Sequence, residues 1–131
     1  MLNGKVNVRL EAIVRLLVRG LEDRVVELEA VVDTGFSGFL SLPHEQVAGL
    51  GLVSRGQVLG ILADGTESYF PIYRGIVLWH GQPLVTTITA IDSTPLLGMS
   101  MLHGSELAMQ IVEDGEVIIH ELPNWSSPHL R

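Results

Sequence analysis

The stretch ELEAVVDTGFSGFLSLP, residues 27–43, places one carboxylate, that of Asp33, between two apolar segments. Before Asp33, the side chains of Leu28, Ala30 and Val32 fall on one face of an extended chain. A carboxylate close to a hydrophobic core costs free energy unless something uses it. We therefore expect a strand that ends at Asp33, where the carboxylate either caps a turn or performs chemistry.

The composition is that of one compact domain with a hydrophobic core. The chain has 131 residues, of which 47% are hydrophobic and 18% charged. Its formal net charge is −7 without a Lys/Arg cluster, which argues against a nucleic-acid partner. No apolar run approaches the ~20 residues of a membrane span, and three arginines interrupt residues 1–20, unlike a signal peptide. Without cysteine, the chain has no thiol nucleophile or thiolate metal site, and we expect a cytoplasmic protein with no membrane partner.

The first part of the chain has a mixed pattern. Apolar and polar residues alternate over residues 6–10, but the period is lost over residues 13–18. This predicts one long twisted strand or two strands, with a helix over residues 10–18 as the alternative. Gly20 and its charged neighbours predict a turn, followed by a strand over residues 24–32.

Turn motifs further along the chain indicate an all-β fold. An Asp-Gly pair within ADGT, residues 63–66, predicts a tight hairpin, and HGQP, residues 80–83, predicts another. A last hairpin is expected to turn at residues 113–115. Between these elements we expect a short strand before Pro43, one or two helical turns after it, and a short helix over residues 100–107.

Two motifs resemble those of the retropepsin-like (clan AA) aspartic proteases: VVDTG, residues 31–35, and PLLGMSML, residues 95–102. The resemblance covers roughly residues 27–122 and includes a hairpin in the position of that family's flap. It implies a closed acid-protease barrel over residues 25–122, with one short helix in its C-terminal half. Residues 1–24 would be an N-terminal strand or extension packed on the same domain, and residues 123–131 a flexible tail.

The resemblance also implies roles for individual residues. Asp33 would be the catalytic residue. The hydroxyl of Thr34 would reach the other subunit of a dimer and brace the two catalytic loops against each other. The carbonyl of Gly35 would accept a hydrogen bond from the backbone of the peptide substrate. Phe36 stands where better-known members of the family have a small residue, so its ring would narrow the cleft or line a substrate pocket. The flap tip, which would close over the substrate cleft, comprises Ala63, Asp64, Gly65 and Thr66. The supports packed beneath the catalytic loop would be Leu96, Leu97 and Gly98.

Activating a water and protonating the substrate carbonyl requires two carboxyl groups. Two carboxylates about 3 Å apart share one proton, and aspartic proteases are the standard example. This chain has one Asp-Thr-Gly, and DSTP, residues 92–95, lacks the glycine of a second copy. We therefore expect a homodimer in which the Asp33 residues pair across a two-fold axis and hydrolyse a peptide or protein substrate, with no metal or other cofactor.

Alternatives to an aspartic endopeptidase are a catalytically idle retropepsin-like dimer, serving as a peptide-binding or dimerisation module, and a small β-barrel binding protein. For Asp33 itself, the alternative to catalysis is a turn or capping aspartate at the end of a strand. The segment HEQVA, residues 44–48, begins like a zinc-binding helix, but Ala48 occupies the position of the second histidine. The Asp-Thr-Gly motif is intact at residues 33–35, which favours the enzyme over the idle dimer.

Overall fold

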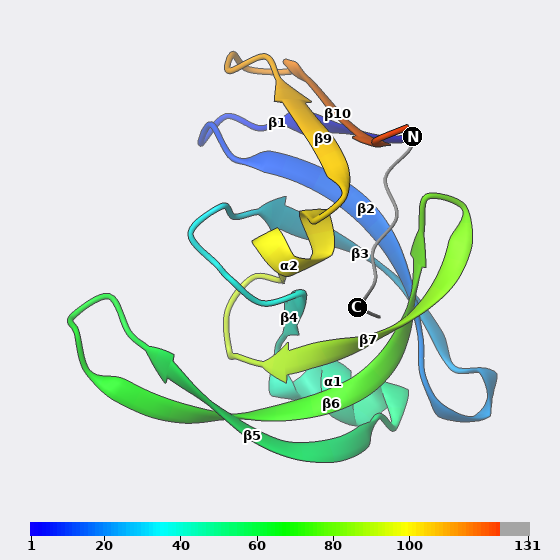
Figure 1. The fold of residues 1–131 in the computed structure, drawn as a ribbon, viewed down its shortest axis with the longest axis vertical. Helices are drawn as coiled ribbons and strands as arrows, with labels where there is room; N and C mark the ends of the chain where they lie inside the picture. Colours follow the sequence, from blue (N-terminus) through cyan, green and yellow to red (C-terminus); the bar gives the residue numbers. More distant parts are fainter. Residues whose placement is uncertain (124–131) are drawn as a thin grey trace.

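A computed structural model describes residues 1–123, and it is dominated by a single ten-stranded sheet (Figure 1). The expected all-β class is confirmed. The end of the expected C-terminal tail, residues 124–131, lies outside the described residues. The strands are β1 (Leu2–Val6), β2 (Ala12–Arg19), β3 (Val25–Val32), β4 (Leu40–Leu42), β5 (Val53–Ile61), β6 (Glu67–Trp79), β7 (Gln82–Ala90), β8 (Leu96–Leu97), β9 (Ser105–Met109) and β10 (Glu116–Glu121).

The N-terminal segment forms two strands, β1 and β2, so the helical alternative over residues 10–18 is wrong. Asn7 makes the turn between them, because its side-chain oxygen accepts hydrogen bonds from the amides of Arg9 and Glu11. Alternate residues of β2 are buried against the core, which requires an extended chain. Both strands belong to the same sheet as the rest of the described chain, since β2 pairs with β3 and β6.

The sheet closes on itself through the pairing of β2 with β6, which makes a ring of strands in the order β6, β7, β4, β8, β3 and β2. The side chains inside this ring form the hydrophobic core, together with residues of β1, β10 and the helices. The largest fully buried side chains are Leu16, Leu40, Leu42, Ile88, Leu97, Met101 and Ile119.

Two short α-helices accompany the sheet. Helix α1 (His44–Leu50) follows Pro43 as expected and ends at Gly51, which adopts a left-handed conformation with φ of 62°. Helix α2 (Met99–Leu102) is shorter than the expected helix over residues 100–107. That expectation is wrong because Gly104, with φ of 87°, redirects the chain into β9, which pairs with β10.

The remaining turns occur where the sequence predicts them. A 3-10 helix (Leu21–Asp23) joins β2 to β3. His80 and Gly81 both have positive φ between β6 and β7, as a two-residue hairpin turn requires. The hairpin of β5 and β6 is long, and its tip projects away from the rest of the sheet (Figure 1). Among residues 1–123, no helix is both long and apolar enough to cross a membrane.

Candidate active site

Asp33 is half-buried and follows the last residue of β3, as the sequence predicts. The short strand β8 lies between β3 and β4, parallel to the first and antiparallel to the second. The amide of Asp33 donates a hydrogen bond to the carbonyl oxygen of Leu97 at 2.9 Å. Leu97 is fully buried, so the backbone of Asp33 is fixed to the centre of the sheet.

The residues after Asp33 turn around its carboxylate. The amide of Gly35 donates to Oδ1 of Asp33 at 2.8 Å, and the amide of Phe36 donates to its carbonyl oxygen at 3.1 Å. Asp33 therefore does cap its own turn. Among the described residues, nothing hydrogen-bonds Oδ2, so the carboxylate is oriented through one oxygen while the other stays open to a second group.

Residues at the start of α2 donate hydrogen bonds to the backbone carbonyl groups of residues 36–39. The amide of Gly98 donates to the carbonyl of Phe39 at 2.9 Å, and the amide of Met99 donates to that of Phe36 at 2.8 Å. Ser100 donates to the remaining two carbonyls, through its amide to Gly38 and through its hydroxyl to Ser37. Every carbonyl of this loop is therefore occupied by residues 98–100, which fixes the loop's conformation.

Two glycines let these backbones approach closely. A Cβ atom on Gly98 would stand 2.2 Å from the carbonyl oxygen of Gly38, which no side chain can tolerate. The ring of Phe36 lies over both glycines, because a Cβ on Gly38 would meet its Cζ at 2.5 Å and one on Gly98 its Cδ2 at 2.7 Å. The half-buried Phe36 therefore packs on the loop that carries Asp33, a support that its sequence position does not reveal.

A buried serine that the sequence pattern does not mark completes this support. Ser41, in β4, is fully buried, and its hydroxyl accepts a hydrogen bond from the amide of Leu96 at 3.1 Å. It bridges β4 and β8 next to the loop over residues 33–39, which we call the Asp33 loop. Its only sequence signal is a hydroxyl residue between two leucines of a short apolar strand.

The expected flap tip is an ordered turn. Oδ1 of Asp64 accepts hydrogen bonds from the hydroxyl of Thr66 at 2.6 Å and from its amide at 2.9 Å. These two bonds, first the hydroxyl and then the amide, lower the pKa of the Asp64 carboxyl. Gly65 has φ of 87°. Residues 63–66 are exposed, and Figure 1 shows this tip apart from the loop between β3 and β4.

Asp92, in the DSTP segment, contacts His44 at the start of α1. Its Oδ1 accepts from the amide of His44 at 3.0 Å and lies 2.9 Å from Nδ1 of the same residue. These contacts lower the pKa of the Asp92 carboxyl, the backbone hydrogen bond contributing most. Asp92 therefore joins the β7–β8 connection to α1, and it does not act as a second carboxylate beside Asp33.

The structure thus gathers Asp33, Thr34, Gly35 and Phe36 with the support residues Leu96, Leu97 and Gly98. Within residues 1–123, no three His, Asp or Glu side chains are grouped in a way that could hold a metal ion. Comparisons with protein-family models, with curated proteins and with solved structures each found no match. The chemistry of the site therefore has to be argued from its own residues.

Proposed function

We propose that this chain is an aspartic endopeptidase whose active site forms when the Asp33 residues of two copies meet across a two-fold axis. The observation that carries this proposal is the hydrogen bonding of the Asp33 loop. Its backbone is fixed by β8 and by residues 98–100, and Oδ2 of the carboxylate accepts no hydrogen bond from residues 1–123. A merely capping aspartate needs no such support for the loop that follows it.

The proposed reaction needs one proton shared by the two carboxyl groups. The ionised carboxylate takes a proton from a water molecule, whose oxygen forms a bond to the peptide carbonyl carbon. The other carboxyl group gives its proton to the carbonyl oxygen, which produces a neutral diol. The first carboxyl then protonates the amide nitrogen while the second takes a proton from a diol hydroxyl. The C–N bond breaks, and the pair returns to its starting state.

The neighbouring residues have supporting roles in this proposal. Thr34 is exposed next to Asp33, where its hydroxyl can donate to the partner's loop across the axis. The carbonyl of Gly35 can accept from the backbone of an extended peptide. The hairpin of β5 and β6 is the proposed flap, and its exposed apolar side chains fit an apolar peptide: Val58, Leu59, Ile61, Leu62 and Tyr69.

The fold implied by this function is a retropepsin-like acid-protease barrel. Two features support it. The strands close into a ring through β2 and β6, and β8 enters that ring directly beside the Asp33 loop. The same features are compatible with an idle dimer of this fold, which differs from the enzyme only in the use made of Asp33.

Cleavage of a diverse peptide library between about pH 4 and 7, where an aspartic-protease pair loses its shared proton, tests the proposal. Wild type, Asp33→Asn and Asp23→Asn are compared, with the dimer measured in each. Asp23 is an exposed residue of the β2–β3 turn with positive φ, which asparagine tolerates. Cleavage lost only in Asp33→Asn supports the enzyme. Full cleavage by Asp33→Asn overturns it, and dimers without any cleavage favour the idle module.

A further inference from the structure

Four exposed apolar side chains lie at two neighbouring turns of the sheet. Val8 and Leu10, in the β1–β2 turn, are 74% and 58% exposed, and Ile111 and Val112, in the β9–β10 turn, are 55% and 60% exposed. We call these four residues the tip patch. Contiguous exposed apolar patches mark sites of protein association, whereas single exposed apolar side chains are ordinary.

The two turns are joined by backbone hydrogen bonds. The amide of Val6 donates to the carbonyl of Gly115, and the amide of Asp114 donates to the carbonyl of Val6, both at 2.9 Å. Gly115 is buried in this junction, and a Cβ on it would stand 1.9 Å from the carbonyl oxygen of Gln110. The tip patch is therefore held by the fold itself, although each of its residues lies in a turn.

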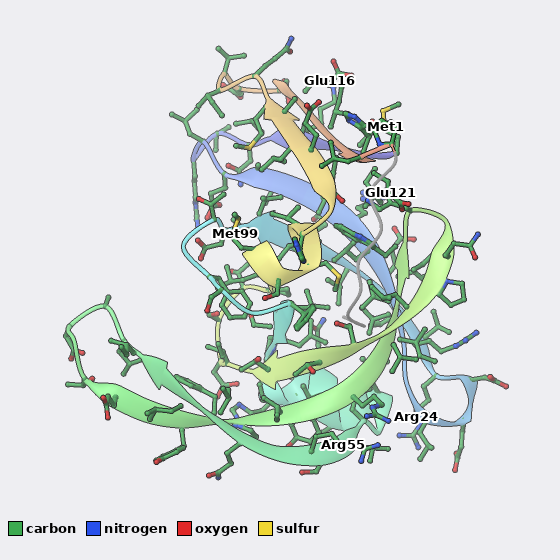
Figure 2. The ribbon with its side chains drawn as sticks, in the orientation of Figure 1. Met1, Arg24, Arg55, Met99, Glu116 and Glu121 are labelled. Carbon is green, nitrogen blue, oxygen red and sulfur yellow. The ribbon has the colours of Figure 1, made fainter. Side chains whose placement is uncertain are left out.

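The tip patch lies on the same side of the molecule as the Asp33 loop. In Figure 1 the β1–β2 turn, the β9–β10 turn, the loop between β3 and β4 and the tip of the β5–β6 hairpin all point to the left. Met99 is 49% exposed, hydrogen-bonds the Asp33 loop through its amide, and points to that side in Figure 2. The β2–β3 and β6–β7 turns lie on the opposite side (Figure 1).

We propose that the tip patch is the contact through which a second copy of this chain brings its own Asp33 to the site. This inference rests on the proposed function, since only a shared dyad leaves the single-chain site incomplete. In a two-fold dimer the same surface meets itself, so it must complement itself. An apolar patch does so, whereas a charged patch would repel its copy, and each chain already carries a net charge of −7.

The size of a stable interface extends the contact beyond the tip patch. Specific dimers bury about 800 Å² per partner, more than four side chains supply. The tip patch has to be continuous with Met99, the Asp33 loop and the tip of the β5–β6 hairpin, which lie along the same side. The tip patch would then form one end of the interface, and the hairpin tips would form the other.

The test compares two double variants of the full chain by analytical ultracentrifugation. Val8→Asp with Val112→Asp places charges in the tip patch. Val25→Asp with Val85→Asp places the same charges at valines that are 51% and 49% exposed on the opposite side. We expect the tip-patch variant to raise the dimer dissociation constant at least about a hundredfold, and we expect the control to leave it unchanged. Circular dichroism checks that both variants fold.

Each outcome separates this inference from the proposed function. A dimeric wild type with a folded, monomeric tip-patch variant supports the interface, even when no protein in the set cleaves peptides. A tip-patch variant as dimeric as the wild type overturns the interface and leaves the endopeptidase standing. A wild type that stays monomeric at all concentrations overturns both. A dimer retained by Val8→Leu with Val112→Leu, conservative changes at the same positions, further supports an apolar contact.

Discussion

Gly98 and Gly38 lie so close together that a Cβ atom on Gly98 would stand 2.2 Å from the carbonyl oxygen of Gly38. This contact joins the end of β8 to the loop that carries Asp33. It explains why a glycine is needed at position 98 although its φ of −101° is open to any residue. The requirement comes from the neighbouring backbone and not from the local conformation.

Gly98→Ala is expected to destabilise the protein by roughly 1–3 kcal/mol, because the loop and α2 must separate to admit the methyl group. Urea unfolding measures the change. Gly49→Ala is the matched control, because Gly49 lies in α1 with no atom within 4 Å of its Cβ position. Alanine there is expected to stabilise the helix by roughly 0.5–1 kcal/mol. Equal effects of the two substitutions would show that the contact with Gly38 is unimportant.

Ser41→Ala is expected to cost roughly 1–3 kcal/mol, because it removes the hydroxyl of a fully buried serine and leaves the part-buried amide of Leu96 without this hydrogen bond. The free energy of unfolding gives the measurement. Ser54→Ala, at an exposed position of β5, is the control and should change stability by less than about 0.5 kcal/mol. If Ser41→Ala is as harmless as the control, Ser41 does not bridge β4 and β8.

Asp33→Asn is expected to reduce peptide cleavage by at least roughly 10²–10⁴-fold, the usual contribution of a group that transfers protons in the transition state. The dimer should persist, because asparagine keeps an oxygen that can accept from the amide of Gly35. In the wild type, cleavage should fall once the pH is high enough to remove the proton that the two carboxyl groups share. A flat pH profile would contradict the paired mechanism.

Thr66→Val is expected to raise the pKa of Asp64 towards its ordinary value of 3.8, because the hydroxyl bond that lowers it most is removed. The amide of Thr66 still donates, so part of the lowering should remain. Since the folded pKa lies below the unfolded one, the stabilisation is complete above pH 3.8 and disappears as the pH falls through the folded pKa. An NMR titration of Asp64 that is unchanged by the substitution would disprove this account of the turn at residues 63–66.

Local patterns predicted the strand that ends at Asp33 and the hairpin turns, because alternation and positive-φ residues act within a few residues. The helix over residues 100–107 was predicted wrongly because the interaction that determines this segment is not visible in its local pattern. The pairing of β9 with β10 decides that segment, and apolar spacing alone does not separate a short strand from a helix.

The site could be predicted only in part for the same reason. The motif around Asp33 and the positions 96–98 are visible in the sequence, but the hydrogen bonds that join them are not. Ser41 binds Leu96 across 55 positions of the chain, and Ser100 binds Ser37 across 63. No neighbouring residue distinguishes these two serines from ordinary surface serines, so only the three-dimensional contacts identify them.

The occupation of the carbonyls of residues 36–39 by residues 98–100 has a consequence for the order in which the chain folds. During synthesis, the loop after Asp33 emerges long before the groups that hold it, and the strand β8 that fixes Asp33 also comes from the later part. Contacts between distant parts of a chain form late, because the intervening loop must close first. A ribosome-bound chain that stops short of Ser100 therefore carries the whole Asp-Thr-Gly motif without a structured site, and any activity has to wait for nearly the complete fold.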